Sequence, residues 1–497
     1  MTTQSIQTLQ HEAARLRQQG RIDRAVDVYR RILDLDPGLA DYWFDLAWML
    51  RQLGQFDAAL DAYDRALAAG VSGPEEVHLN KGVILTDELH QPDAAEAAYL
   101  AALAIRPDYL PALLNLGNLH EENADRETAI ATYERLIEAG AGQADAKARN
   151  IVAEAQARRA LILPKDRLPE TELEALAALA QTPALSAEAR ANCAFALGRI
   201  RDRDGDVDAA FSAWTLANTQ AATTGAAYDP RRGEAMMQAL LSHVPQASAK
   251  EADTPPIFIC GLFRSGSTLV ERVLSAHGAI EQGGELDLLM RLAMTRFSPY
   301  PAGLERQSAQ ALNDAQAHYL ASLDAKFPGV RATGRRVTDK WPDNYLFIGM
   351  ILALFPGARI IHTVRDLRDV AISMYGQHLD QQACPYSSDL SAIGHHFGQY
   401  RRLMAGWKAR YAAQIHDFNY DRFVSAPEEA LRPLFEFLDL DWDPAVLDFH
   451  QRAGSVKTAS YWQVRQPLYA TSSGRWKAYE RHLAPFLDAL AAAGEAP

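Results

Sequence analysis

The sequence predicts a multidomain protein in which an all-α solenoid of helical hairpins precedes an α/β domain with a parallel sheet. A 34-residue repeat within residues 1–150 predicts the solenoid. Apolar strands that alternate with helical stretches over residues 254–497 predict the α/β domain. We expect residues 151–253 to form a helical connector between them. With 497 residues, 48% of them hydrophobic, the chain can bury several large cores.

The repeat becomes visible when Gly20 to Tyr29 is aligned with Gly54 to Tyr63. Each copy places a Tyr four residues after an Ala, and a later copy repeats the pair at Ala129 and Tyr133. Residues four apart share a helix face, so the Ala lets helices approach while the Tyr fills the groove. The pattern resembles tetratricopeptide repeats, whereas a generic helical bundle would not explain the spacing. Such solenoids present a concave surface, so we expect a protein or peptide partner.

The connector stays helical but loses the regular period. We expect one further hairpin there, with a helix over Ala187–Arg199 and a small-then-aromatic pair at Ala210 and Trp214. The sequence Thr254-Pro255-Pro256 then ends the helical pattern.

Beyond this boundary the alternation of strands and helices is typical of a parallel sheet with helices on both faces. The predicted strands are residues 257–260, 337–339, 358–364 and 415–420. Ligands of such sheets bind at the carboxyl ends of the strands. Because Arg264, Lys340 and Arg365 each follow or end a predicted strand, we expect them to converge on one crevice.

The first strand leads into a loop of small residues and then into a helix. Backbone N–H groups at the start of that helix would bind an anion, aided by the positive end of the helix dipole. The residues that supply these groups are Ser265, Gly266, Ser267 and Thr268.

The spacing from Gly261 to Gly266 is that of a nucleotide-binding P-loop, but Ser267 replaces the lysine that should follow. A Walker-type kinase or ATPase is therefore disfavoured. The cation lies inside the loop instead, at Arg264, whose guanidinium can bind two oxygens of a phosphate or sulfonate. A simple Gly/Ser turn would leave this arginine unexplained.

The segment from Arg264 to Leu269 resembles the 5′-phosphosulfate loop of sulfotransferases, in particular protein-tyrosine sulfotransferases and bacterial relatives with tetratricopeptide repeats. The resemblance covers about residues 255–483. Further motifs of that family follow in the same order: Gly283-Gly284-Glu285, Thr338-Asp339-Lys340, and Arg365 with Ser373.

This resemblance implies that the sulfuryl donor is 3′-phosphoadenosine 5′-phosphosulfate (PAPS), that the product is 3′,5′-adenosine bisphosphate, and that no metal is required. Arg264 and the loop amides would bind the 5′-phosphosulfate, and Lys340 would reach its bridging oxygen. Glu285 would accept the proton of the acceptor. The 3′-phosphate would be bound by Arg365 and Ser373. Further nucleotide contacts would come from Tyr420, Ser460, Arg465 and Trp476.

Each of these assignments has a structural alternative. Glu285 could be a carboxylate that a helix N-terminus stabilises, and Lys340 could be a solvent-exposed turn lysine. Arg365 could belong to a surface ion-pair cluster, and Tyr420 could be an edge residue that packs on a helix. One departure from the animal enzymes is Gln377, where they carry another basic residue.

The net charge of −13 is concentrated in residues 1–150, which hold 24 acidic and 14 basic residues. This charge disfavours a nucleic-acid partner. The three cysteines are too few and scattered for a disulfide framework or a Cys-rich metal site. The first 20 residues lack the apolar core of a signal peptide, and the longest apolar run, 345–355, is too short to span a bilayer. We therefore expect a cytoplasmic protein without a membrane span.

The function predicted from the sequence is sulfation of an acceptor hydroxyl, a tyrosine of a protein or peptide that the repeats present. A sugar, lipid or small phenol is an alternative acceptor, since fold and cofactor do not fix it. A second alternative is an inactive repeat scaffold that binds the nucleotide, but the presence of Arg264, Glu285 and Lys340 together favours an enzyme. A homo-oligomer is compatible with either function.

Overall fold

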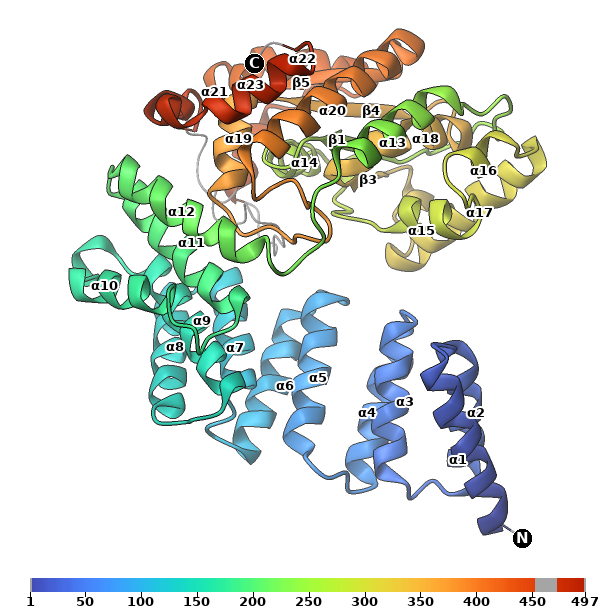
Figure 1. Cartoon of the computed structure of the whole chain (residues 1–497). Helices are drawn as coiled ribbons and strands as arrows, with labels where there is room; N and C mark the ends of the chain where they lie inside the picture. The colour runs from blue at the N-terminus through green and yellow to red at the C-terminus, as the bar shows by residue number, and fades with distance from the viewer. Residues whose placement is uncertain (1, 452–471, 496–497) are drawn as a thin grey trace. The chain divides into compact units, whose positions relative to one another are not determined.

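The computed structural model of this chain describes residues 2–451 and 472–495 (Figure 1). It forms two compact units, Met1–Ala196 and Leu197–Pro497. The predicted fold class is confirmed, because a region of helical hairpins is followed by an α/β domain with a parallel sheet. The domain boundaries proposed at residues 150 and 253 remain predictions.

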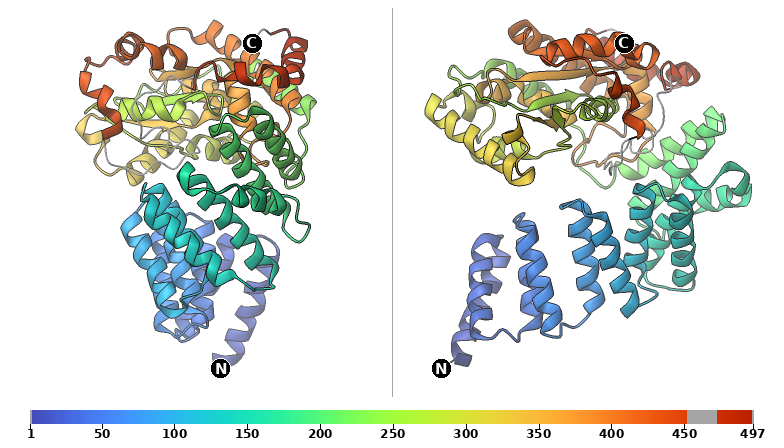
Figure 2. Two further views of the ribbon diagram at one scale, coloured as in Figure 1. Left: turned by 90° about the vertical axis from the view of Figure 1, so that its left-hand side faces the viewer. Right: turned by 180° about the vertical axis from the view of Figure 1, so that it is seen from behind.

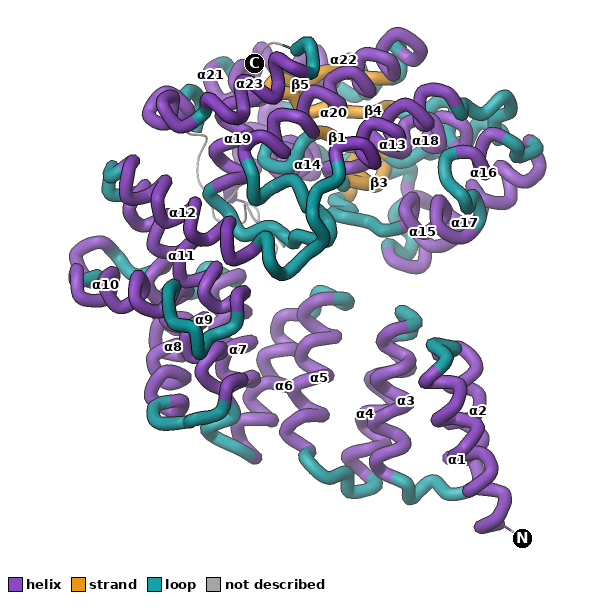
Figure 3. Tube along the Cα trace, viewed as in Figure 1, coloured by secondary structure: helices purple, strands orange, loops and turns teal. Residues whose placement is uncertain are grey.

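The first unit consists of helices joined by short turns, and consecutive helices pack as antiparallel hairpins (Figure 3). Its helices are α1 (Thr2–Gln18), α2 (Ile22–Leu35), α3 (Ala40–Gln52), α4 (Phe56–Ala68), α5 (Pro74–Asp87), α6 (Pro92–Ile105), α7 (Leu110–Glu122), α8 (Arg126–Gly140), α9 (Ala146–Ile162), η1 (Lys165–Arg167) and α10 (Glu170–Leu179). Helix α11 (Ala187–Arg203) crosses from this unit into the next.

The repeated Ala and Tyr residues form the core of the hairpins, as their spacing predicts. Ala129 and Tyr133 are both fully buried in α8. Gly117 of the preceding helix makes room for the ring, because a Cβ atom there would lie 2.5 Å from Cε1 of Tyr133. The Tyr133 hydroxyl donates to Oε2 of Glu121 at 2.8 Å, so the ring cannot simply turn aside. Gly82 makes room for the Tyr99 ring in the same way, so close helix packing in these two hairpins depends on a glycine opposite the ring.

The second unit contains a five-stranded sheet in which all paired strands are parallel, in the order β2-β3-β1-β4-β5. Two further views show strands of this unit surrounded by helices (Figure 2). The strands are β1 (Ile257–Gly261), β2 (Ile280–Glu281), β3 (Arg336–Lys340), β4 (Arg359–Val364) and β5 (Ile415–Asn419). Four of them match the predicted strands closely, whereas the two-residue β2 was not predicted. The central position of β1 places the loop that follows it between the ends of β3 and β4.

Helices cover both faces of this sheet. On one face, Ile259 and Ile361 share a core with Val270 of α14 (Ser267–Ser275) and Leu431 of α22 (Pro427–Phe437). On the other, Phe258 packs on Tyr319 of α17, with ring centroids 6.2 Å apart. The remaining elements are α12 (Val207–Ala221), α13 (Pro230–Ser242), α15 (Leu288–Thr295), α16 (Ala302–Glu305), α17 (Ala309–Lys326), η2 (Arg331–Thr333), η3 (Pro342–Phe347), α18 (Ile348–Leu354), α19 (Leu367–Tyr375), α20 (Leu390–Tyr411), α21 (Tyr420–Ser425), η4 (Pro444–Gln451), η6 (Arg475–His482) and α23 (Ala484–Ala492).

The hairpin expected after residue 187 is present as α11 and α12. Ala210 and Trp214 are buried, and a Cβ atom on Gly198 would lie 2.3 Å from Cδ1 of Trp214. The same indole packs against Tyr479 of η6, with ring centroids 5.3 Å apart. Helix α12 thus shares a core with the C-terminal segment of the second unit.

Within the described residues, none of the helices combines the length and apolar character that crossing a bilayer would require.

The close packing of α7 on α8 predicts that Gly117→Val destabilises the repeats. The added side chain would overlap the buried Tyr133 ring, and such overpacking costs about 1–3 kcal/mol. Urea denaturation followed by helical circular dichroism should show an earlier transition, and amide exchange in α7 and α8 should become faster. Gly38→Ala is the control, because its new Cβ would meet only the Asp36 carboxylate, at 3.2 Å. Equal effects of the two substitutions would contradict this packing.

Candidate active site

The loop after β1 has a backbone shape that favours anion binding. Gly266 is the N-cap of α14 and has a φ of +101°, and a Cβ atom there would lie 2.6 Å from Cδ2 of Tyr420. Arg264 has a φ of +71°, a left-handed conformation that costs a non-glycine residue about 1–3 kcal/mol. Such strain is characteristic of functional loops, where the surrounding structure enforces it.

Hydrogen bonds fix this loop to the neighbouring strand β4. The hydroxyls of Ser265 and Thr363 lie 2.6 Å apart, and the Ser265 hydroxyl also lies 2.6 Å from the carbonyl oxygen of Leu262. Gly261 leaves space for this contact, because a Cβ atom on it would lie 2.2 Å from Oγ1 of Thr363. The loop amides are therefore held in place at the N-terminus of α14.

The predicted phosphate-binding residues lie together at the ends of β1, β4 and β5. Nε of Arg264 donates to Oγ of Ser373 in α19 at 2.9 Å. Nη1 of Arg365 donates to the carbonyl oxygen of Arg264 at 3.1 Å, and its guanidinium carbon lies 4.6 Å from the centroid of the Tyr420 ring. Nε of Arg365 is buried and has no hydrogen-bond partner within the described part of the chain. An unsatisfied guanidinium nitrogen beside the loop suits an anionic ligand.

Glu285 and Lys340 form an ion pair at the end of β3. Nζ of Lys340 donates to Oε1 of Glu285 at 2.6 Å. The lysine side chain is 1% exposed, so it is not a solvent-exposed turn residue, whereas the glutamate is 39% exposed and accessible to an acceptor. Helix α15 begins only at Leu288, so Glu285 precedes its first turn.

Asp339, the middle residue of the Thr338-Asp339-Lys340 motif, is hydrogen-bonded within the protein core instead. Successive residues of a strand point to opposite faces, so Asp339 faces away from its neighbour Lys340. It accepts from the hydroxyl of Tyr319 at 2.6 Å and from the amide of Asn344 at 3.1 Å. Burial raises the pKa of Asp339 to about 7, although both hydrogen bonds oppose this rise.

Sequence reasoning missed Glu271, a fully buried carboxylate in α14. Its Oε1 accepts from the backbone N–H of Gly284 at 2.9 Å and from the hydroxyl of Thr338 at 2.7 Å. The sequence could have indicated it, because Glu271 follows Ser267 by four residues, about one helical turn, and so lies on the same face of the helix.

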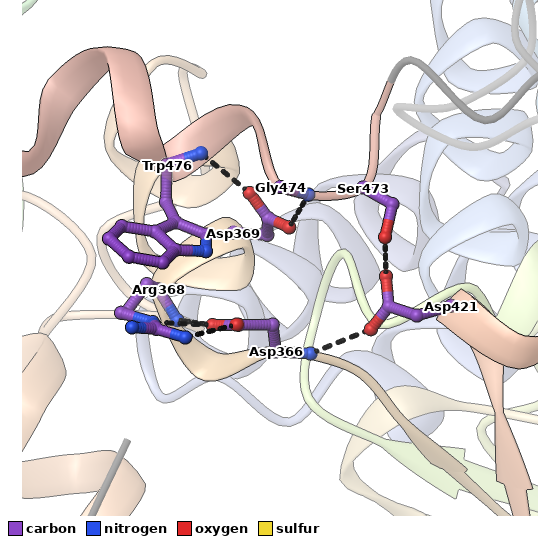
Figure 4. A network of polar contacts seen from close by, with 7 residues as sticks. All are labelled: Asp366, Arg368, Asp369, Asp421, Ser473, Gly474 and Trp476. Carbon is purple, nitrogen blue, oxygen red and sulfur yellow. Dashed lines mark hydrogen bonds and ion pairs between the residues drawn. The ribbon is translucent and has the colours of Figure 1, made fainter.

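A C-terminal segment, Ser472–Trp476, is bound to the helices that follow β4 and β5 (Figure 4). Asp369 is 2% exposed and accepts from the backbone N–H groups of Gly474, at 2.6 Å, and Trp476, at 2.7 Å. Burial raises the pKa of Asp369, although both N–H groups and Arg365 oppose the rise. The Arg368 guanidinium lies 3.5 Å from the centroid of the Trp476 ring.

Asp421 at the start of α21 completes this network (Figure 4). It accepts from the backbone N–H of Asp366 at 3.1 Å and from the hydroxyl of Ser473. On the same side, Nη2 of Arg365 donates to the carbonyl oxygen of Ser472. Arg368 forms an ion pair with Asp366 at 2.6 Å, whereas Arg365 donates to the carbonyl oxygen of Arg264 in the loop after β1.

The predicted contacts of Ser460 and Arg465 lie outside the described residues. Trp476 is described, and it lies in the segment that binds beside Arg365. A cavity of about 580 Å³ opens at the carboxyl ends of β4 and β5, against α20. Its wall includes Ser265, Thr363 and Arg365, so two of the predicted phosphate-binding residues, Ser265 and Arg365, border this cavity, whereas Arg264, Glu285 and Lys340 are not part of its lining.

Comparison with known proteins identifies the class of this chain. Residues 255–444 match the model of the sulfotransferase family. Residues 12–74, 50–109 and 112–147 match tetratricopeptide repeat models. The comparison therefore shows a sulfotransferase domain preceded by tetratricopeptide repeats.

Among individual proteins, the chain is similar to protein-tyrosine sulfotransferases. It is 27% identical over 249 residues to the protein-tyrosine sulfotransferase of Drosophila melanogaster, and the matched region covers 45% of this chain and 47% of that protein. It is 28% identical over 432 residues to an uncharacterized protein of Aquifex aeolicus (strain VF5), which covers 83% of this chain and 53% of that protein. The chain thus spans about half the length of these relatives.

Among solved structures, the chain is matched by the sulfotransferase domain from the Synechococcus PCC 7002 olefin synthase. It is 21% identical in sequence and has a TM-score of 0.37, and the match covers 50% of this chain and 97% of that chain.

The network around Asp369 predicts that Asp369→Ala releases the segment Ser472–Trp476. Two backbone N–H groups would lose a charged acceptor, and each such hydrogen bond is worth about 1.5–3 kcal/mol. Amide exchange at Gly474 and Trp476 should therefore accelerate by at least about tenfold. Asp208→Ala is the control, since Asp208 is exposed and binds the more distant Arg481. Equal exchange in both variants would show that Asp369 does not hold the segment.

Proposed function

We propose that this chain is a PAPS-dependent sulfotransferase whose acceptor is a tyrosine of a protein or peptide. The observation that carries the proposal is the ion pair of a buried Lys340 with the accessible Glu285, at the end of the strand beside the anion-binding loop. This arrangement places a fixed cation and a candidate base side by side. Similarity to protein-tyrosine sulfotransferases supports both the reaction and the acceptor.

The donor would be bound through its two anionic ends. Arg264 and the amides at the start of α14 would bind the 5′-phosphosulfate. Ser373 and Arg365, whose Nε is buried without a partner in the described structure, would bind the 3′-phosphate. The contact between Arg264 and Ser373 already joins these two groups of residues, so both ends of the nucleotide can be bound at once.

In the reaction, the acceptor oxygen attacks sulfur while the bond from sulfur to the bridging phosphate oxygen breaks. Lys340 and Arg264 would stabilise the negative charge that develops on that leaving oxygen. Glu285 would take the phenolic proton, whose acidity increases as the new sulfur–oxygen bond forms. Because the protein supplies the cations, we expect the reaction to need no divalent metal.

The repeats would recruit the acceptor. Residues 1–150 carry ten of the thirteen net negative charges of the chain. A solenoid with this charge would favour a tyrosine flanked by basic residues.

The proposal predicts transfer from radiolabelled PAPS to a tyrosine peptide with lysine flanks, with equal rates in the presence and absence of EDTA. Glu285→Gln should lower kcat by about 10²–10⁴-fold, since it removes the general base. Its affinity for 3′,5′-adenosine bisphosphate, measured by calorimetry, should stay unchanged. Asp287→Asn is a control two residues away, where an exposed carboxylate pairs only with Arg291 among the described ion pairs.

Two results would overturn this assignment. A Glu285→Gln variant that keeps more than about a tenth of the rate would exclude the general-base role. Binding of the bisphosphate without transfer to tyrosine, sugar, lipid or phenol acceptors would indicate an inactive scaffold.

The acidic repeats also predict how the acceptor preference responds to salt. KM for the lysine-flanked peptide should rise when salt shortens the Debye length to about 10 Å or less, because screening weakens attraction between charges. KM for a matched peptide with serine flanks should change little. Identical salt responses of the two peptides would show that the charge of the repeats does not select the acceptor.

A further inference from the structure

Glu271 is a buried acid that the proposed reaction does not use. Its side chain is fully buried in α14, and its Oε1 accepts two hydrogen bonds. Oε2 is also buried and has no hydrogen-bond partner within residues 2–451 and 472–495. Burial of a carboxylate is unfavourable unless other groups compensate its charge, so the presence of a glutamate at this buried position needs a physical reason.

The hydrogen-bonded oxygen of Glu271 holds the loop that carries Glu285. It accepts from the backbone N–H of Gly284 and from the hydroxyl of Thr338. The same hydroxyl oxygen accepts from the backbone N–H of Gly283 at 2.9 Å. These contacts tie the two residues that precede Glu285 to β3 and α14.

The fit between this loop and β3 is close. A Cβ atom on Gly283 would lie 1.8 Å from the carbonyl oxygen of Thr338, so only glycine allows the approach. The backbone N–H of Lys340 donates to the carbonyl oxygen of Gly284 at 2.9 Å. The backbone of Glu285 is therefore fixed beside the strand residue whose side chain it pairs with.

Glu271 also acts on Lys340 through its charge. Burial raises the pKa of Glu271, and the positive charge of Lys340 opposes that rise most strongly among the neighbouring groups. Two carboxylates therefore act on the charge of Lys340. Glu285 contacts it directly, and Glu271 acts from α14, where it is hydrogen-bonded to the loop.

This second carboxylate matters when Glu285 changes its charge. In the proposed reaction the acceptor proton moves to a carboxylate oxygen of Glu285, which becomes neutral. Lys340 would then lose the negative charge in contact with it, at the moment when the leaving phosphate oxygen gains negative charge. A negative charge on Glu271, which the positive charge of Lys340 favours, would then still act on the ammonium group.

We propose that Glu271 is a positioning residue for the Glu285–Lys340 pair, which it serves by anchoring the Gly283–Glu285 loop and by placing a second carboxylate near Lys340. The inference rests on the proposed sulfotransferase function. The alternative is a purely structural role, in which Glu271 only stabilises the fold as a hydrogen-bond acceptor.

Glu271→Gln separates these two roles. The amide oxygen of glutamine can still accept from Gly284 and Thr338, but the charge is absent. We expect kcat to fall by about 10–100-fold, a size typical of residues that support an active-site group. The KM values for PAPS and peptide and the melting temperature should stay near those of the wild type. An unchanged kcat would reduce Glu271 to a structural role.

A double-mutant cycle tests whether Glu271 acts through Glu285. If it does, Glu271→Gln should have little further effect on kcat in a chain that already carries Glu285→Gln, because coupled residues are not additive. Full additivity of the two effects would overturn the proposal. Arg272→Lys is a matched control, since it keeps the charge of the neighbouring buried residue in α14.

Amide exchange gives a readout that does not depend on activity. Glu271→Ala should accelerate exchange at Gly284 by at least about tenfold, because its N–H loses a charged acceptor, whereas Glu271→Gln should not. Unchanged exchange in Glu271→Ala would refute the anchoring role even if no acceptor were sulfated. Absence of transfer by the wild type together with faster exchange in Glu271→Ala would instead reject only the proposed function.

Discussion

A buried lysine charge that needs compensation is the constraint on which the candidate active site depends. Lys340 ends a central strand of the sheet, where its ammonium group is almost completely withdrawn from water. Such a charge is tolerated only with carboxylates close by. Glu285 provides one from the loop between β2 and α15, and Glu271 of α14 lies close enough to act on the charge of Lys340. The Glu285–Lys340 ion pair, the Gly283–Glu285 loop and helix α14 are therefore parts of one electrostatic arrangement.

Strand order determines which loops can take part. Because β1 lies between β3 and β4, the loop that follows β1 is adjacent to Lys340 on one side and to Arg365 on the other. The left-handed backbone of Arg264 then directs its side chain to Ser373 in α19. The candidate site is thereby built from the ends of three neighbouring strands.

The C-terminal segment connects this site to the last helical hairpin. Gly474 and Trp476 bind Asp369, while Tyr479, only three residues further on, packs against Trp214 of α12. The Asp202 carboxylate of α11 accepts from the Tyr479 hydroxyl at 2.5 Å. The helical hairpin that the sequence analysis places in the connector is thus physically linked, through residues of the second unit, to the residues around Arg365.

The sequence by itself determined the helical repeats, four of the five strands and the residues that follow them, because local periodicity and strand ends are short-range patterns. It therefore identified Arg264, Lys340 and Arg365 as neighbours. Tertiary structure alone decided that Lys340 is buried against Glu285, that Asp369 binds the C-terminal segment, and that Glu271 holds the loop. Charge compensation and backbone hydrogen bonds of this kind join residues 13 to 107 positions apart, so no local pattern encodes them.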